Sequence, residues 1–395
     1  MKFADRVDRI QPSMTMAVIE KAATLRAKGI DVVDFGAGEP DYGTPEHIKQ
    51  AAIQALKDGH TRYTKNAGID ELREAICQKL SRDNNLDYTP NQILVSNGAK
   101  HVLFNSMMAT LGPGDEIIIF SPYWVTFPEM AKLTGATPII IETRDTNHFE
   151  PDLDEVRQAV TSNTRAILMN SPSNPSGMVY SEETIRGIYD ICAENDLFLI
   201  SDECYERVTY SAEAVSPAKY EDEPTHVVTV QSCSKSYAMT GWRVGYAAAN
   251  ADLIKNMAKI QSQSASHANS IAQYAAVTAL SGDQSFIGDM VKEYNNRRDF
   301  VLQRLAEIPD VTCTKPEGAF YVFPNLSAYY GNQFNGSTIS DSLDMTSFLL
   351  EEANIAVVPG GAFGADNHIR ISYATSMREL ERGLERMERA LEKLQ

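Results

Sequence analysis

Short runs of consecutive apolar residues alternate with longer amphipathic stretches through the middle of the chain. Such runs, rich in β-branched side chains and separated by helical patterns, are typical of strands buried on both faces of a largely parallel sheet. We expect strands at residues 93–96, 116–121, 137–141, 166–170, 197–201, 227–232 and 244–248. The pattern predicts an α/β domain over residues 46–285, in which ligands gather at the carboxyl ends of the strands.

The last part of the chain shows a helical period instead. Apolar residues recur there at spacings of three and four: Met377, Leu380, Leu384, Met387, Leu391 and Leu394. They form one apolar stripe on a helix, and because the stripe is short we expect it to pack on its own domain rather than in a coiled coil. With strand-like segments at residues 356–359 and 369–373, it predicts a smaller α/β domain made of residues 1–45 and 286–395.

The length of the chain indicates how many domains it has, and its charge excludes some classes of partner. Its 395 residues exceed the size at which one hydrophobic core usually stops growing, so two domains are expected. The 53 acidic residues outnumber the 36 basic residues and give a formal net charge of −17. Because such a chain repels phosphate backbones and anionic lipid surfaces, neither nucleic acid nor a membrane is an expected partner.

The cysteines and the first residues of the sequence indicate the cellular compartment of the protein. The five cysteines are odd in number, widely spaced and free of Cys-x-x-Cys pairs, so they indicate neither a disulfide framework nor a zinc site, and no metal is expected. The charged start of the chain lacks the apolar stretch of a signal peptide, and no apolar run is long enough for a membrane span. We therefore expect a protein of the reducing cytoplasm.

One lysine has an unusual setting. The segment Ser232-Cys-Ser234-Lys235 follows a predicted strand, and Arg243 lies a little further along. The two serines can donate hydrogen bonds without crowding, and the planar fork of an arginine suits phosphate oxygens. Most lysines are simply solvated. This layout is instead expected of a lysine that holds an aldehyde cofactor as an imine while its neighbours bind the cofactor phosphate.

The motif Ser-x-[Ser/Ala]-Lys followed by Gly-x-Arg-x-Gly resembles that of the pyridoxal-phosphate aminotransferases of the aspartate aminotransferase family, in the bacterial aspartate subgroup. Further motifs of that family occur in the family order along nearly the whole chain. The resemblance implies a fold-type-I transferase with a large, mainly parallel α/β/α sandwich domain and a smaller α/β domain. It also implies pyridoxal 5′-phosphate as cofactor and Lys235 as the catalytic residue, with Ser232, Ser234 and Arg243 at the cofactor.

The resemblance assigns roles to three residues that follow other predicted strands. Alone, the aspartate of Asp202-Glu-Cys-Tyr205 would be a helix N-cap and Asn174-Pro-Ser-Gly a turn. By the family match, Asp202 keeps the cofactor ring nitrogen protonated, while Tyr205 and Asn174 bind the ring oxygen. Stabilising the phenolate form would lower the pKa of the Lys235 imine, so that it acts near neutral pH.

A further segment offers a phosphate site. Ser96-Asn-Gly98-Ala99-Lys100 follows a strand and opens a helix, so its backbone N–H groups and helix dipole favour an anion. By itself this is only a helix start. The resemblance assigns cofactor binding to Gly98, Ala99 and Lys100, and gives Lys100 an additional contact with the distal carboxylate of the substrate.

Substrate binding is expected around Arg370 in His-Ile-Arg-Ile-Ser-Tyr, which matches the arginine that clamps the α-carboxylate in the family. A solvated surface arginine is the alternative. Trp124 matches an aromatic residue that stacks on the cofactor ring, and both Trp124 and Asn174 are expected to contact substrate. Gly38 matches a backbone segment next to the α-carboxylate, and Phe320 should line the pocket. Trp242 is assigned to packing.

The resemblance also has implications for assembly and specificity. Tyr63 matches a tyrosine that reaches the cofactor phosphate of the neighbouring subunit, which implies a homodimer with shared active sites. Animal and enteric aspartate enzymes bind the distal carboxylate with a partner-chain arginine, and the matching position here is Gln261. Lys100, with Thr15 near the start of the chain, would have to replace that arginine.

We therefore expect an aminotransferase that moves the amino group of L-aspartate to 2-oxoglutarate by a ping-pong mechanism through a Lys235 Schiff base. Three alternatives stay open: an aspartate/prephenate aminotransferase, an aromatic or alanine aminotransferase, and a cystathionine-type β-lyase on the same fold. A cofactor-sensing regulator is disfavoured because the short segment ahead of Gly38 cannot supply a DNA-binding domain.

Overall fold

The computed structural model describes residues 3–12 and 14–394, without the side chains of residues 14–17 and 19. Its centre is a seven-stranded sheet in the order β2-β8-β7-β6-β5-β3-β4. The strands are β2 (Ile93–Ser96), β3 (Glu116–Ser121), β4 (Thr137–Glu142), β5 (Thr164–Asn170), β6 (Phe198–Asp202), β7 (Val227–Ser232) and β8 (Gly245–Ala248). Each lies where the apolar runs predict it, apart from small shifts at the ends.

The sheet is parallel except for β8, which runs antiparallel to both β2 and β7. The connection from β7 to β8 contains only α9 (Cys233–Ser236) and the 3₁₀ turn η4 (Thr240–Trp242). Parallel neighbours need a longer crossover, usually a full helix. The connection therefore stays at the carboxyl end of β7.

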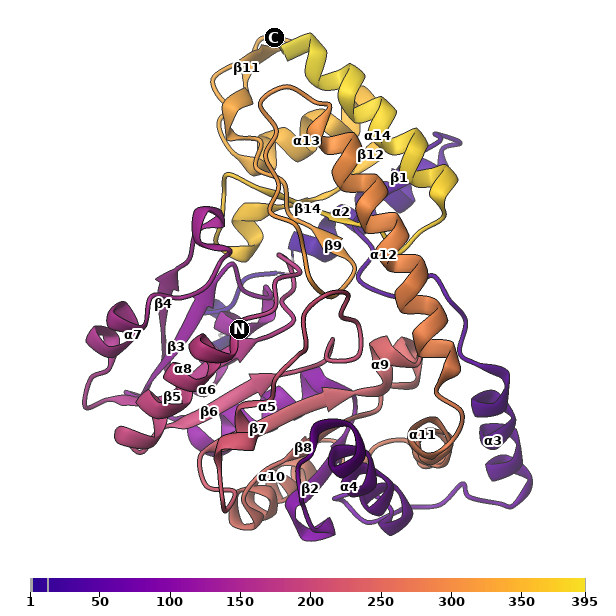
Figure 1. Cartoon of the computed structure of the whole chain (residues 1–395), viewed down its shortest axis with the longest axis vertical. Helices are drawn as coiled ribbons and strands as arrows, with labels where there is room; N and C mark the ends of the chain where they lie inside the picture. The colour runs from indigo at the N-terminus through magenta and orange to yellow at the C-terminus, as the bar shows by residue number, and fades with distance from the viewer. Residues whose placement is uncertain (1–2, 13, 395) are drawn as a thin grey trace.

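Helices cover both faces of this sheet (Figure 1). One apolar core holds residues of α3 (Glu46–Lys57), α4 (Asp70–Asn84), α7 (Leu153–Ala159), α8 (Glu182–Glu194) and α11 (Ser270–Ser281). The other holds residues of α5 (Ala99–Thr110), α6 (Thr126–Thr134) and α10 (Ala251–Ser264). Ile118 packs in the first core and its neighbours Ile117 and Ile119 in the second. Burial on both faces is the reason these strands are continuously apolar.

A smaller part lies above the large sheet in Figure 1. Its helices are α2 (Met14–Ala27), α12 (Ser285–Ala306), α13 (Ser342–Ala353) and α14 (Met377–Leu391), the last followed by η7 (Glu392–Leu394). One sheet has the order β13 (Val358–Pro359), β14 (Ile369–Ser372), β9 (Tyr321–Val322). Two further sheets have two strands each. One pairs β1 (Val33–Asp34) with β12 (Ile355–Ala356), and the other pairs β10 (Gln333–Phe334) with β11 (Ser337–Thr338).

Two expectations for this part need correction. The predicted strand at residues 356–359 is divided between β12 and β13, which join different sheets. The predicted stripe of α14 is buried except at its first member, since the Met377 side chain is 39% exposed. Met377 is the first residue of this helix.

The long helix α12 connects the two parts (Figure 1). Ile287 in its first turn packs in a core of the large sheet, whereas Met290 and Tyr294 pack in the core of the smaller part. We propose a division into residues 46–285 and residues 1–45 with 286–395, because the packing partners change within the first turns of α12.

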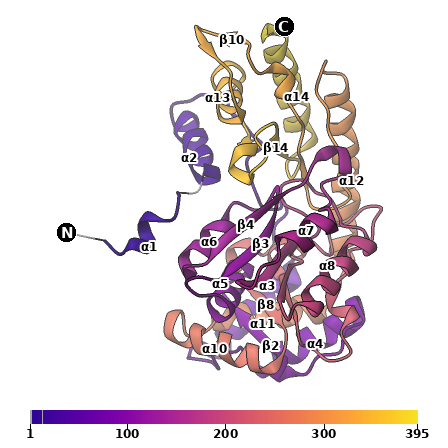
Figure 2. The same ribbon diagram turned by 90° about the vertical axis from the view of Figure 1, so that its left-hand side faces the viewer.

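The N-terminal helix α1 (Asp5–Asp8) projects from the body of the molecule (Figure 2). Beyond it, the backbone N–H of Gln11 donates to Oε2 of Glu129 at 2.7 Å. Among the helices of the described residues, none combines the length and the apolar character that crossing a bilayer requires.

Candidate active site

The site begins with the position of β8 between β2 and β7. Gly245, the first residue of β8, pairs with Ser96 at the end of β2 and with Ser232 at the end of β7. This register brings the turn after β2 next to the segment after β7. As a result, Lys235 and Arg243 lie at the same edge of the sheet as the turn that contains Gly98.

Two glycines make this approach possible. Gly98 has φ +80°, a conformation that favours glycine, and a Cβ there would overlap the guanidinium of Arg243. A Cβ at Gly245 would overlap the backbone of Ala99. The helix α5 begins directly after Gly98, so its first N–H groups and the Arg243 guanidinium form an open cradle suited to an anion.

A cavity of about 500 Å³ opens beside this cradle. Twelve of the residues that the sequence analysis selects line it: Gly38, Ala99, Lys100, Trp124, Asn174, Asp202, Tyr205, Ser232, Ser234, Lys235, Arg243 and Arg370. They come from seven segments spread over more than three hundred positions of the chain. The cavity also has walls that the sequence analysis leaves out: Asp34, Ala37, Glu39, Val125, Thr126, Asn170, Cys204 and Thr240.

Lys235 extends from α9 between aromatic side chains. Its Nζ donates to the backbone oxygen of Gly38 and lies 5.7 Å from the ring centres of both Tyr205 and Phe320. Burial lowers the pKa of Lys235 to about 8. A useful fraction of this amine is therefore unprotonated near neutral pH and able to act as a nucleophile or a base.

Asp202 is the last residue of β6 and is buried. Its Oδ1 accepts a hydrogen bond of 3.2 Å from the backbone N–H of Cys204. Asn170 at the end of β5 donates through Nδ2 to the Asp202 carbonyl at 2.9 Å, which ties the two strand ends together. Burial raises the pKa of Asp202 to about 6. A cation in the cavity would favour its ionised form.

Arg370 lies on β14 and is almost fully buried. Its Nη1 donates to Oδ1 of Asn174 at 2.9 Å and its Nη2 to the Gly36 carbonyl at 2.8 Å. Its Nε has no hydrogen-bond partner, and burial lowers the pKa of the guanidinium. Because a buried cation with an unsatisfied donor is costly, an anion at this end of the cavity would be stabilising.

Lys100 provides a second cation at the mouth of the cavity. Its Nζ lies 4.8 Å from the ring centre of Trp124, within the range of a cation–π interaction. The pair comes from the first turn of α5 and from the loop after β3. Both the Lys100 ammonium group and the Trp124 indole therefore lie at the cavity wall.

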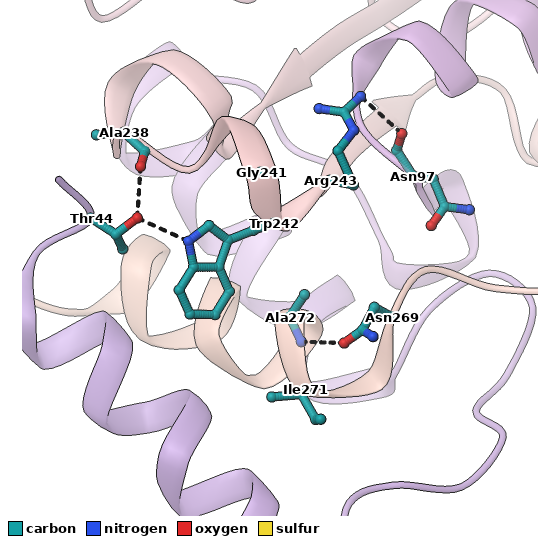
Figure 3. A pocket seen from close by; sticks show the side chains of 9 residues that line it. All are labelled: Thr44, Asn97, Ala238, Gly241, Trp242, Arg243, Asn269, Ile271 and Ala272. Carbon is teal, nitrogen blue, oxygen red and sulfur yellow. Dashed lines mark hydrogen bonds between the residues drawn. The ribbon is translucent and has the colours of Figure 1, made fainter. Parts of the chain in front are cut away.

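Arg243 faces more than one cavity. Its Nη1 donates to the Thr240 carbonyl at 2.8 Å and its Nη2 to the Asn97 carbonyl at 3.3 Å. Besides the central cavity, it lines a second one of about 550 Å³, shown in Figure 3. Trp242 lines that second cavity, where its Nε1 donates to Thr44. Trp242 also packs against the core that holds residues of α3, α4 and α11, in keeping with the packing role expected for it.

Some expected site residues lie elsewhere. Tyr63, which the family match assigns to the site of a neighbouring subunit, is 92% exposed and packs edge-on against His267. Phe320 is completely buried and is not among the residues that line the central cavity, although its ring centre lies 5.7 Å from Nζ of Lys235. The side chain of Thr15 lies outside the described residues.

Gln261, which matches the position of the partner-chain arginine of other aspartate enzymes, has a structural setting. This side chain is completely buried on α10. Its Nε2 donates to the carbonyls of Asn66 and Val95 at 2.6 and 2.8 Å, and its Oε1 accepts from Ser96 at 2.5 Å. These hydrogen bonds connect α10 to the end of β2 and to the loop before α4, so Gln261 serves as a structural tie.

Comparison with known proteins agrees with this geometry. The family described as aminotransferase class I and II matches residues 30–387. A probable aspartate/prephenate aminotransferase of Aquifex aeolicus is 46% identical and an aspartate aminotransferase of Geobacillus stearothermophilus 44% identical, and both alignments cover 99% of each chain. The solved aspartate aminotransferase of Thermus thermophilus with maleate is 42% identical, with a TM-score of 0.94, over 99% of this chain and 100% of that one.

The fold and the full-length match agree with the expectation from the lysine motif. The α/β architecture with a mostly parallel central sheet is confirmed. Substrates of such enzymes are amino acids and 2-oxo acids. The chain therefore belongs to the class I and II aminotransferases, enzymes that depend on pyridoxal 5′-phosphate.

Proposed function

We propose that this aminotransferase takes the amino group from L-aspartate and passes it to 2-oxoglutarate. The observation that carries the proposal is the pair of cations on the cavity wall, Arg370 and Lys100. A dicarboxylic substrate offers one carboxylate to each of them. The names of the Geobacillus and Thermus relatives, and the dicarboxylate maleate in the solved Thermus structure, support the same substrate class.

The residues present fit the cofactor. The open cradle formed by Gly98, Ala99 and Arg243, with Ser234 and Ser232 beside it, suits a phosphate group. When bound, pyridoxal phosphate supplies an aldehyde carbon that takes up the amino group and a protonated ring that accepts the electron pair of the broken C–H bond.

We assign contacts with the cofactor ring to four side chains. The indole of Trp124 offers a flat apolar surface for stacking. The Asp202 carboxylate would keep the ring nitrogen protonated, because a negative charge beside this nitrogen favours its positively charged, protonated form. The Tyr205 hydroxyl and Asn174 amide would hydrogen-bond the ring oxygen. All four line the central cavity.

Lys235 is the proposed acid–base residue. With a pKa of about 8 it can remove the proton from the α-carbon of the substrate and deliver it to the neighbouring carbon of the cofactor. Its contact with the Gly38 carbonyl holds the amine at the cavity wall. Arg370 would bind the α-carboxylate with two parallel hydrogen bonds, and so orient the α-hydrogen toward Lys235.

The proposed assembly is a homodimer with shared active sites. Class I and II aminotransferases are commonly dimeric. Tyr63 is 92% exposed, an unusual position for a large aromatic side chain. Arg243 also lines the cavity in Figure 3, whose volume of about 550 Å³ would admit such a side chain from a second copy. The proposed location is the cytoplasm, supported by five cysteines without paired spacing.

A second candidate function is that of an aspartate/prephenate aminotransferase. The Aquifex relative is named for both aspartate and prephenate. Prephenate carries two carboxylates and a ring, so it would use the same two cations.

The first experiment is to add L-aspartate to the purified holoenzyme and follow the absorption band of the cofactor. We expect aspartate to convert the band and 2-oxoglutarate to restore it. Parallel reactions with phenylalanine or alanine as the donor, with prephenate in place of 2-oxoglutarate as the acceptor, and with cystathionine for a lyase product test the alternatives. If aspartate leaves the band unchanged while an aromatic amino acid or alanine converts it, the proposed substrate is wrong.

A further inference from the structure

Tyr321 contacts two walls of the site without lining the cavity. It is completely buried in β9. Its hydroxyl forms a hydrogen bond of 2.8 Å with the hydroxyl of Tyr205, and its ring centre lies 4.5 Å from Cζ of Arg370. One side chain thus joins the residue proposed for the cofactor ring oxygen to the residue proposed for the substrate carboxylate.

The strand register explains this position. β9 and β14 are antiparallel, and Ser372 pairs with Tyr321. Arg370, two residues before Ser372, is therefore the diagonal neighbour of Tyr321 on the same face of the sheet. Phe320 lies in the turn before β9, where its ring centre is 4.8 Å from that of Tyr321 and 5.7 Å from Nζ of Lys235. The register of β9 with β14 selects Tyr321 for contact with Arg370.

The hydroxyl pair has two possible directions, since either oxygen can donate the proton. If Tyr205 donates to Tyr321, it has no proton left for an acceptor in the cavity. If Tyr321 donates, the Tyr205 hydroxyl is free to donate into the cavity, and the bond it accepts polarises it as a donor. An acceptor at the proposed place of the ring oxygen therefore needs Tyr321 as the donor.

The ring of Tyr321 has a separate effect. The Arg370 guanidinium contacts both this ring and that of Phe363, whose centre is 5.2 Å from Cζ. Contacts of this type hold a desolvated guanidinium in a fixed plane. A bidentate contact with a carboxylate requires such a plane.

We propose that Tyr321 is a positioning residue with two separable actions: its hydroxyl directs the Tyr205 hydroxyl toward the cofactor, and its ring fixes the Arg370 guanidinium for the substrate carboxylate. The inference rests on the proposed roles of Tyr205 and Arg370. Because different atoms of one side chain carry the two actions, substitution can separate them.

Tyr321→Phe removes only the hydroxyl. We expect the pH midpoint of the absorbance change of the bound cofactor to rise by roughly half a pH unit, since the ring-oxygen phenolate loses part of its stabilisation. The affinity of the cofactor-free protein for pyridoxal phosphate should fall a few-fold, and KM for aspartate should stay within about twofold. Tyr321→Leu removes the ring as well and should raise KM for every amino donor by about five- to tenfold.

The chain offers a matched control. Tyr373 is also completely buried, and its hydroxyl pairs with that of Tyr210 at 2.9 Å, away from the cavity. Tyr373→Phe removes the same group from the same kind of pair. It should lower stability about as much as Tyr321→Phe and leave the cofactor midpoint unchanged.

The outcomes separate this inference from the proposed function. If Tyr205→Phe shifts the cofactor midpoint but Tyr321→Phe does not, the inference about the hydroxyl is overturned and the role of Tyr205 stands. If neither variant shifts it, the proposed role of Tyr205 falls and takes the inference with it. If Tyr321→Phe raises KM as much as Tyr321→Leu, the ring has no separate action. Should the leucine variant not fold, the phenylalanine variant still decides the hydroxyl action.

Discussion

Nη1 of Arg370 donates a hydrogen bond of 2.9 Å to Oδ1 of Asn174, although the two residues lie 196 positions apart in the chain. Arg370 belongs to the smaller sheet, and Asn174 follows β5 of the large one. The contact sets the position of the two parts at the site and places a buried cation beside the proposed ring-oxygen ligand. The predictions below follow from this site.

Arg370→Lys should raise KM for both amino donor and 2-oxo acid by about 10- to 100-fold, with a smaller effect on kcat. A lysine keeps the charge but cannot form two parallel hydrogen bonds. Steady-state kinetics with aspartate measure the change. Arg297→Lys, at a buried arginine that pairs with Asp41, is the control and should leave KM unchanged. An Arg370→Lys enzyme with normal KM would show that the substrate carboxylate binds elsewhere.

Lys235→Ala should lower kcat by a factor of at least roughly 10²–10⁴, the usual contribution of a positioned acid–base group. Cofactor should still bind through its phosphate contacts, so absorbance titration distinguishes lost catalysis from lost binding. The exposed Lys219, which pairs with Glu182, provides the control position. Near-normal turnover by Lys235→Ala would exclude Lys235 as the base.

Lys100→Ala should raise KM for aspartate far more than for phenylalanine, because only aspartate has a second carboxylate for this ammonium group. The loss expected for one charge-assisted contact is about 1.5–3 kcal/mol, or roughly 10- to 100-fold. Comparison of kcat/KM for the two substrates measures it. Equal losses for both would contradict the specificity role and leave Lys100 as a cofactor ligand only.

Asp202→Asn should stabilise the cofactor-free protein and weaken cofactor function. Burial raises the pKa of Asp202 from 3.8 to about 6, so between these values the folded state binds more protons than the unfolded state. Folding stability is therefore lost as pH rises through this window, and the full penalty of about 3 kcal/mol at most is present above pH 6.

Denaturant unfolding of the cofactor-free protein at several pH values tests this sign. The gain from Asp202→Asn should be present above pH 6 and shrink toward pH 4. A gain that is independent of pH would mean that the charge of Asp202 is not the cause.

Tyr63 permits a test of the shared sites. Tyr63→Ala should leave the unfolding free energy of the chain within about 0.5 kcal/mol, because the side chain is exposed, yet lower cofactor affinity. Mixing Tyr63→Ala and Lys235→Ala chains under exchange conditions should restore activity, since each hybrid dimer holds one site with Tyr63 from one chain and Lys235 from the other. Mixtures as inactive as their parents would contradict the shared-site proposal.

The sequence predicts the strands of the large sheet because burial on both faces leaves a continuous apolar run in each of them. It also predicts which residues gather around the cavity, since motifs such as Asp202 and Asn174 directly follow predicted strands. Ligand sites at carboxyl ends of strands are a general property of such sheets. Neighbouring strand ends therefore bring residues together that are far apart in the chain.

Other features depend on packing between distant segments, which a single sequence does not display. The direction of β8 follows from its connection to β7, and that direction places Arg243 beside Gly98. Glutamine is mostly found at the surface of proteins. Gln261 is nevertheless buried, and its amide donates to the carbonyls of Asn66 and Val95.

The motif Gly-Ala-Phe-Tyr marks a site segment without saying which aromatic ring faces Arg370. The local sequence thus fixed the elements and the chemistry at their ends, because apolar period and turn residues are local properties. Only the tertiary structure decided that Tyr321 contacts Arg370, because the face of a short strand is set by its register with β14, and that Phe320, in the turn before this strand, lies near Lys235.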